Sequence, residues 1–130
     1  MGNTVALIGV FDGMHQGHLN IINNASRMGN LYVGVVKDEA VKRVKGNPLF
    51  DEEHRLAIVK NLRNVANAFL VDDFDASLLQ KNMTYDIFVR GEDQDHIAGW
   101  EKLNEYTLVV TVKRTPDVST TKLKERLNGQ

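Results

Sequence analysis

Two histidines follow a glycine-rich turn near the start of the chain. Residues 9–18 have the sequence Gly-Val-Phe-Asp-Gly-Met-His-Gln-Gly-His and come directly after an apolar run. His15 and His18 are three positions apart, so their side chains share one face if this segment begins a helix. Gly17 between them leaves room for a group to approach the backbone closely. Helix N-termini at strand-to-helix junctions present free N–H groups and a positive dipole end, so this segment is suited to binding phosphate.

The histidine pair has two other interpretations, a polar helix start and a pair of metal ligands. The metal interpretation is the weaker one, because a four-ligand site needs more donors and the chain has no cysteine. We therefore predict no metal site built from protein side chains alone. Asp12 also has alternatives: it is an ordinary turn residue, it orients a histidine ring nitrogen, or it helps to hold Mg²⁺.

A second group of polar residues lies near the carboxyl end. Residues 113–122 read Lys-Arg-Thr-Pro-Asp-Val-Ser-Thr-Thr-Lys, so the basic end of a predicted strand leads to three consecutive hydroxyl residues. Helix capping explains one of these hydroxyls but not three together with an arginine. Such a helix start offers hydroxyl and N–H donors to a phosphate, with Arg114 as a fork-shaped cation.

A third candidate segment is Arg90-Gly91-Glu92-Asp93, directly after a predicted strand. Glycine at this position allows a flat ligand to lie against the backbone, whose amides then contact the edge of a base. The same four residues also suit an ordinary turn.

Short segments rich in Val, Ile and Leu alternate with helix-like segments along the chain. The predicted strands are residues 5–10, 31–36, 68–71, 86–90 and 107–112, and the predicted helices are residues 17–28, 52–64, 76–82, 96–103 and 120–127. The first helix places Leu19, Ile22 and Ala25 on one stripe, and Asp51 is a suitable N-cap for the second. We predict a single domain over residues 1–130, a Rossmann-like three-layer α/β/α fold with a five-stranded parallel sheet.

Residues 38–48 are predicted to form a basic, mobile loop after the second strand. The segment and the residue before it carry four basic side chains and end in Gly46-Asn47-Pro48, which interrupts regular structure. Val41 and Val44 are three apart, so the segment has room for one helical turn. In α/β folds this position overlooks the ligand crevice.

Composition narrows the classes of function. The chain has 130 residues, is 42% hydrophobic and 25% charged, and carries a net charge of −1. This charge gives no overall attraction to nucleic acid or to an anionic membrane, and we expect neither nucleic-acid binding nor membrane insertion. The chain has no cysteine and shows no signal peptide or membrane-spanning stretch, so we expect a cytoplasmic protein.

Two motifs resemble those of a known family. Phe11-Asp12-x-x-His15-x-Gly17-His18 resembles the HxGH motif of the nucleotidyltransferase superfamily. Residues 114–121, Arg-Thr-Pro-Asp-Val-Ser-Thr-Thr, resemble the RTxGISTT motif of its cytidylyltransferases, and glycerol-3-phosphate cytidylyltransferases are the nearest branch. The sequence departs from that pattern at Asp117, where the motif has glycine, and at Glu92, where the family has aspartate. Residues 41–46 are more similar to the adenylyl-transferring heptose-phosphate branch.

The resemblance implies transfer of CMP from CTP to a small phosphorylated alcohol or sugar, with release of pyrophosphate. It implies Mg²⁺ bound mainly through the triphosphate, and a homodimer. The residues that it implies are catalytic are His15, His18, Lys45 and Arg114. Those that it implies bind the nucleotide are Gly9, Val10, Phe11, Asp12, Gly17, Arg55, Gly91, Asp93, Thr115, Ser119 and Thr120.

Two alternatives stay open from the sequence. One is an adenylyltransferase that uses ATP and a heptose phosphate. The other is a nucleotide sensor that keeps the fold without catalysis, although the histidine motif and Arg114 speak against it. A nucleic-acid-binding module has little support from the nearly neutral charge.

Overall fold

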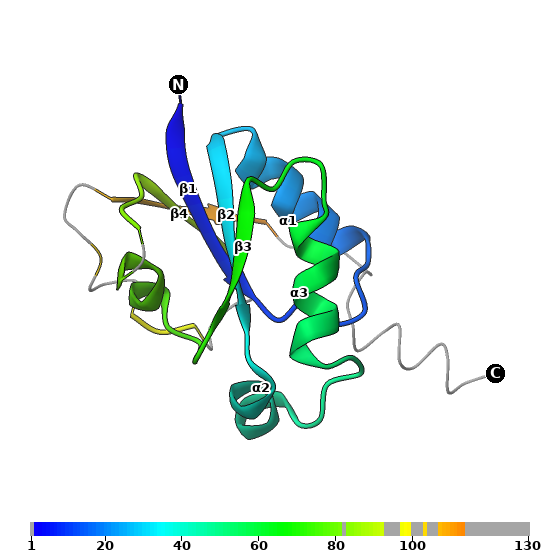
Figure 1. The fold of residues 1–130 in the computed structure, drawn as a ribbon. Helices are drawn as coiled ribbons and strands as arrows, with labels where there is room; N and C mark the ends of the chain where they lie inside the picture. Colours follow the sequence, from blue (N-terminus) through cyan, green and yellow to red (C-terminus); the bar gives the residue numbers. More distant parts are fainter. Residues whose placement is uncertain (1, 82, 93–96, 100–102, 104–106, 114–130) are drawn as a thin grey trace.

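Five parallel strands form one sheet in the order β3-β2-β1-β4-β5 (Figure 1). The computed structural model describes residues 2–81, 83–92, 97–99, 103 and 107–113. The strands are β1 (Asn3–Gly9), β2 (Gly29–Val36), β3 (Asn67–Val71), β4 (Ile87–Gly91) and β5 (Leu108–Val112). This confirms the predicted Rossmann-like five-stranded parallel sheet.

Helices pack on both faces of the sheet. They are α1 (Gln16–Ser26), α2 (Asp38–Lys45), α3 (Glu52–Lys60) and a 3₁₀ helix, η1 (Ala76–Lys81). Helices α1 and α3 lie side by side on one face, and η1 covers the other, while α2 lies beyond the carboxyl end of β2 (Figure 1). The described residues thus form a helical layer, a sheet and a thinner third layer.

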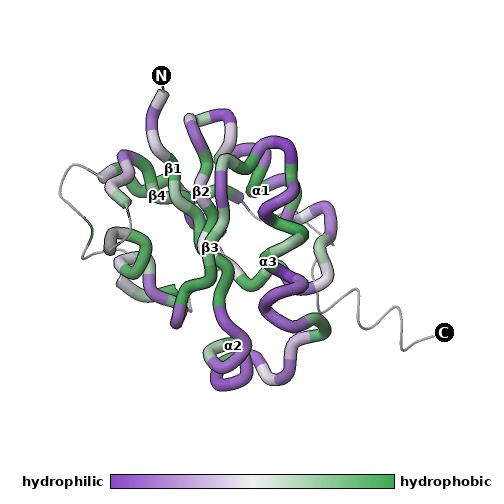
Figure 2. Tube along the Cα trace, in the orientation of Figure 1, coloured by the Kyte–Doolittle hydropathy of each residue, from purple (hydrophilic) through white to green (hydrophobic). Residues whose placement is uncertain are grey.

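Both faces of β1 are buried. Val5 and Leu7 point toward α1 and α3, whereas Ala6 and Ile8 point toward η1. Because successive side chains of a strand point to opposite faces, a strand covered on both sides needs an unbroken apolar run. Figure 2 shows this apolar centre and the hydrophilic residues that dominate α2.

The chain changes direction across the sheet at β1. The connections β1–β2–β3 proceed toward one edge, and β4 and β5 then lie on the other side of β1. In open α/β sheets the crevice at such a reversal, outside the carboxyl ends of the strands, binds ligands. The histidine segment begins directly after Gly9 and therefore lies at this position.

The structure corrects the prediction of a loop over residues 38–48. Residues Asp38–Lys45 form helix α2, because Ala40 and Val41 are buried against the core. Acidic residues in its first turn and basic residues in its last turn also favour the helix through its dipole. Gly46, with a φ of +90°, ends α2, so the irregular part of the segment starts there.

Three other predictions need revision. Leu19 is 38% exposed, so the buried stripe of α1 keeps only Ile22 and Ala25. The helix predicted over residues 76–82 is the 3₁₀ helix η1. The helix predicted over residues 96–103 is wrong at Ile97–Gly99, where Ala98 forms a parallel bridge with Asp75 instead. The last predicted helix, residues 120–127, lies outside the described residues.

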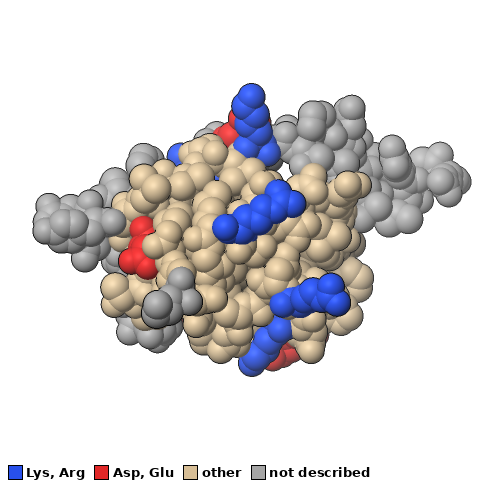
Figure 3. Space-filling model, turned by 90° about the horizontal axis from the view of Figure 1, so that it is seen from above, with Lys and Arg blue, Asp and Glu red and all other residues tan. Residues whose placement is uncertain are grey.

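Viewed from the amino ends of the strands, the molecule presents separated Lys and Arg side chains on a mainly uncharged surface (Figure 3). This face is opposite the histidine segment, and its described residues give no continuous basic surface for a polyanion. In the described part of the chain, each helix is too short or too polar to cross a bilayer.

Candidate functional site

A strained turn carries the chain from β1 into α1. Phe11 has a φ of +54° and Gly13 a φ of +64°, and a positive φ is rare for a bulky residue. Phe11 is nevertheless buried, and its ring lies edge-on to that of His18, with 5.6 Å between ring centroids. A Cβ added at Gly9 would lie 2.8 Å from the Phe11 ring, so glycine there makes room for this packing. The turn therefore fixes Phe11 as a support for His18.

The two histidines cap helix α1 reciprocally. His15 is the N-cap residue, and its Nδ1 accepts a hydrogen bond of 3.0 Å from the backbone N–H of Gly17. Nδ1 of His18 accepts one of 3.2 Å from the backbone N–H of His15. The rings stack with centroids 3.9 Å apart and an interplanar angle of 28°. The arrangement is that of a capping box, with histidines in the places that Ser or Thr and Glu or Gln usually occupy.

These contacts determine the protonation of both rings. A backbone N–H only donates, so each Nδ1 is unprotonated, and a neutral ring then carries its proton on Nε2. Burial lowers the pKa of His15, and burial together with the His15 and Lys45 charges lowers the pKa of His18 to about 3. His18 is therefore neutral near pH 7, and each ring presents Nε2–H as a donor.

Lys45 lies within electrostatic reach of His18, because its charge contributes to the lowered pKa of that ring. It is the last residue of α2, and its side chain is exposed. Of the predicted catalytic residues, the structure brings His15 and His18 into direct contact, and the charge of Lys45 acts on His18. Two neutral N–H donors beside an ammonium group form a site suited to a polyanion.

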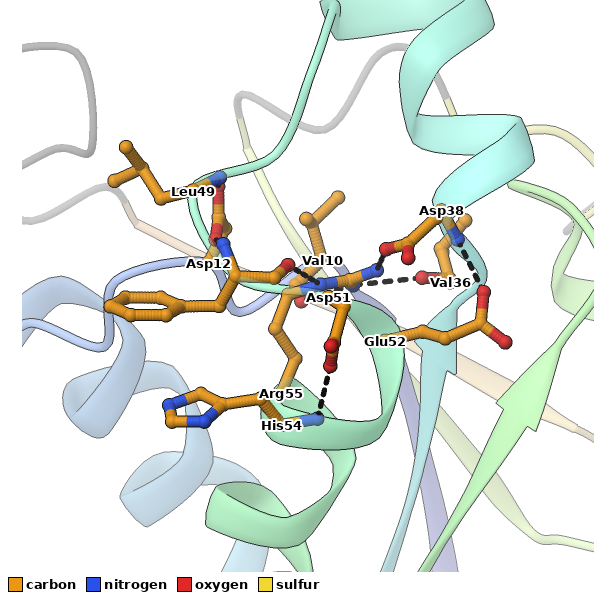
Figure 4. Close-up of polar contacts among 10 residues, drawn as sticks. Val10, Asp12, Val36, Asp38, Leu49, Asp51, Glu52, His54 and Arg55 are labelled. Carbon is orange, nitrogen blue, oxygen red and sulfur yellow. Dashed lines mark hydrogen bonds and ion pairs between the residues drawn. The ribbon is translucent and has the colours of Figure 1, made fainter.

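Asp12 holds the segment that follows α2. Asp12 is 6% exposed, and its carboxylate accepts hydrogen bonds from the backbone N–H groups of Leu49, at 2.7 Å, and Phe50, at 2.9 Å (Figure 4). Asp12 is thus more than a local turn residue, since it joins the histidine turn to a segment 37 positions away.

Arg55, which the resemblance implies binds the nucleotide, is buried, and its hydrogen bonds are made to groups of the protein itself. Its guanidinium donates to the carbonyl oxygens of Val10, Val36 and Phe50 at 2.8–3.0 Å and to the carboxylate of Asp38 at 2.6 Å (Figure 4). The side chain is fully shielded from solvent, and these donors point inward. Asp38, which the sequence analysis did not single out, is its acidic partner; the sequence separation of 17 positions gave no signal for this pair.

Gly9 and Gly91 come to neighbouring positions. The ladder between β1 and β4 pairs Leu7 with Val89, and each glycine follows two residues later on its own strand. Gly91 pairs in turn with Val112 at the end of β5, so the three strand ends lie at one edge of the sheet. The remaining predicted residues, Asp93, Arg114, Thr115, Ser119 and Thr120, lie outside the described residues.

The residues that the structure describes contain no group of three or more His, Asp or Glu side chains arranged to hold a metal ion. Asp12, the carboxylate nearest in sequence to the histidines, has its oxygens engaged by two backbone N–H groups. These residues do not suit a resident divalent cation.

Comparison with known proteins agrees with this geometry. The Cytidylyltransferase-like family matches residues 6–126. The FAD synthase of Methanopyrus kandleri is 38% identical over 73% of this chain and 66% of its own length. The glycerol-3-phosphate cytidylyltransferase of Bacillus subtilis is 29% identical over 96% of this chain and 97% of its own. The chain spans only 26% of the bifunctional protein HldE of Alcanivorax borkumensis, which is 33% identical.

A solved structure shares the fold. The lipopolysaccharide core biosynthesis protein of Thermoplasma volcanium superposes with a TM-score of 0.73 and 28% identity, over 88% of this chain and 98% of its own. The family match extends over most of the chain and includes the turn, both histidines and Lys45. The chain belongs to the Cytidylyltransferase-like family of the nucleotidyltransferase superfamily.

Proposed function

We propose that this protein transfers a nucleoside monophosphate from a nucleoside triphosphate to the phosphate group of a phosphorylated alcohol or sugar. An oxygen of the acceptor phosphate attacks the α-phosphorus, the bond between the α-phosphorus and its bridging oxygen breaks, and pyrophosphate leaves with the electron pair. The products are a nucleoside diphosphate ester and pyrophosphate. The reciprocal capping of His15 and His18, which leaves Nε2–H of both rings as donors at the start of α1, is the observation that carries this proposal.

The site has the groups that this reaction needs. A phosphate monoester has a second pKa of about 6, so the acceptor is largely a dianion at neutral pH and requires no general base. The work of the protein is to hold two anions in line and to stabilise the charge that builds on the leaving pyrophosphate. Neutral imidazoles suit this task, because their donors stay fixed without taking up a proton. Lys45 supplies the positive charge.

CTP is the first candidate nucleotide. It is supported by the motif in residues 114–121 and by the likeness to a glycerol-3-phosphate cytidylyltransferase over nearly the full length of both chains. ATP is the second candidate, because several FAD synthases are 32–40% identical to this chain, and FAD contains an adenylyl group. With either nucleotide the acceptor belongs to one chemical class, because FMN, glycerol phosphate and sugar phosphates are all phosphate monoesters of polyhydroxy alcohols.

The remaining expectations complete the proposal. Mg²⁺ enters as part of the nucleotide substrate, bound by triphosphate oxygens. Arg114, Ser119 and Thr120 contact the β- and γ-phosphates, and Thr115 also binds the nucleotide. Gly9, Gly91 and Asp93 form the base pocket, and the protein is a homodimer.

A matrix of nucleotides and acceptors tests the proposal. The purified chain is mixed with Mg²⁺, with CTP or ATP, and with glycerol 3-phosphate, FMN or a heptose phosphate, while pyrophosphate release is followed by a coupled assay. We expect release only when both the nucleotide and one acceptor are present, and greater thermal stabilisation by that nucleotide than by the other. A protein that binds a nucleotide but releases no pyrophosphate with any acceptor would be a sensor and not an enzyme.

A further inference from the structure

The segment between α2 and α3 is held from two sides by buried charged side chains. Asp12 accepts from the N–H groups of Leu49 and Phe50, and Nε of Arg55 donates to the carbonyl oxygen of Phe50. Phe50 is nevertheless 42% exposed and its ring stacks on that of His54, so backbone hydrogen bonds and this ring contact anchor the segment, and not deep burial of its apolar side chains. These hydrogen bonds fix the path of the backbone at residues 49 and 50.

The same arginine fixes the start of α2. It donates to Asp38, the first residue of that helix, and to the carbonyl oxygens that follow or end β1 and β2, at Val10 and Val36. The carboxylate of Glu52 additionally accepts from the backbone N–H of Asp38 at 2.8 Å. Helix α2 is therefore tied at its first residue, and the chain after it is tied again at residues 49 and 50, four and five positions beyond Lys45.

We propose that Asp12 and Arg55 are positioning residues that act through Lys45. Together with Asp38 and the backbone of residues 49 and 50 they form what we call the clasp. The clasp holds the first residue of α2 and the chain that follows its last residue, Lys45, whose charge acts on His18. This role rests on the proposed function, because it assigns the clasp to the assembly of the polyanion site.

A purely structural clasp would behave differently. If Asp12 and Arg55 only stabilised the fold, their substitution would lower stability and would affect turnover whether or not Lys45 were present. If they act through Lys45, their substitution has no further effect once that side chain is removed. Groups that act as one unit give strongly non-additive effects, and a double-mutant cycle measures this.

The test compares Asp12→Asn, Lys45→Ala and the double variant in the pyrophosphate assay. Asparagine keeps one acceptor oxygen but replaces the other with a donor, so one backbone hydrogen bond of the clasp is lost. We expect kcat to fall by about 10-fold for Asp12→Asn in the wild-type background and by less than about 2-fold in the Lys45→Ala background. Asp72→Asn removes the same charge from an exposed ion pair with Lys37 and is the matched control. Equal losses in both backgrounds, or no loss in either, would overturn the proposal.

A second measurement does not depend on activity. The ring resonances of His18 are recorded by NMR at neutral pH in the same four proteins. We expect Asp12→Asn to shift them in the direction that Lys45→Ala does, and to add no further shift in the double variant. A further shift of equal size in the double variant would contradict the role through Lys45. Arg55→Lys tests the contribution of Arg55 to the clasp in the same way. Arg27→Lys, on the exposed end of α1, is its control.

If the wild-type chain released no pyrophosphate with any substrate, the proposed function would fail. The NMR cycle would still decide whether the clasp places Lys45 beside His18. Thermal unfolding of each variant verifies that it is folded, so the two kinds of failure are distinguishable.

Discussion

Substitution of His18 separates its structural role from its chemical one. His18→Ala removes the acceptor that satisfies the N–H of His15 and the edge contact with Phe11. Loss of a capping bond costs about 1 kcal/mol, and a domain of ordinary stability, about 5–15 kcal/mol, stays folded after it. Loss of a preorganised donor to the developing charge lowers kcat by about 100-fold or more, which corresponds to about 2.7 kcal/mol of barrier. The loss of activity therefore exceeds what unfolding explains.

His18→Glu is the complementary variant. Glutamate at this position of α1 accepts the same backbone N–H, as in an ordinary capping box, and its charge suits a helix N-terminus. We expect the free energy of unfolding to match or exceed that of His18→Ala, while turnover falls below that of His18→Ala, because a carboxylate repels the triphosphate. Urea denaturation and the pyrophosphate assay measure the two quantities. A folded His18→Ala protein with unchanged turnover would refute the assigned role.

Three further predictions follow from the geometry. The pKa of His18 is about 3 in the folded protein and near 6.5 in the unfolded chain, so the unfolded state takes up a proton first as the pH drops below 6.5. We therefore expect the free energy of unfolding to be lower by up to about 2 kcal/mol at pH 5. An NMR titration of this ring with a normal midpoint would contradict the prediction. Lys45→Ala lowers kcat at least about 10-fold. Its free energy of unfolding stays within about 0.5 kcal/mol of wild type, because the side chain is exposed. A variant with the turnover of the wild type would exclude Lys45 from the site. Gly9→Ala displaces the Phe11 ring, lowers the free energy of unfolding by about 1–3 kcal/mol and lowers turnover. Gly34→Ala, in the core beside Val71, lowers the free energy of unfolding alone. The reverse pattern would contradict the role of Phe11 in supporting His18.

Local sequence signals were sufficient for the central part of the fold. Val5 to Ile8 form a continuous apolar run because both faces of β1 are covered, and Asp51 caps α3 through the N–H of His54 as expected. The spacing of His15 and His18 correctly indicated a shared helix start. These features depend on neighbours within a few positions, which a sequence displays directly.

Features that depend on distant residues were missed. The polar sequence of residues 38–45 indicated a loop, because nothing local revealed that Ala40 and Val41 pack against the core. The resemblance implied that Arg55 binds the nucleotide, whereas the structure shows it bonded to carbonyl oxygens of Val10 and Val36, which are 45 and 19 positions away. Every residue type has a backbone carbonyl, so the sequence does not indicate which carbonyl groups at strand ends will accept hydrogen bonds from an arginine.

Residues 97–99 illustrate a competing tertiary contact. Gly99 adopts a φ of +78°, and a Cβ there would meet the carboxylate of Asp75. The neighbouring Ala98 exchanges backbone hydrogen bonds with Phe74 and Ala76. This pairing across the structure prevails over the helical pattern that the local sequence suggested.

The central claim is that two neutral, Nε2-protonated histidines hold a triphosphate, and ¹H–¹⁵N NMR of the imidazole rings tests it most directly. At pH 7 we predict that His15 and His18 are neutral with the proton on Nε2, and that these resonances move when CTP or ATP is added with Mg²⁺ but not when the uncharged nucleoside is added. Rings protonated on Nδ1, or resonances that do not change at saturating nucleotide, would contradict the account.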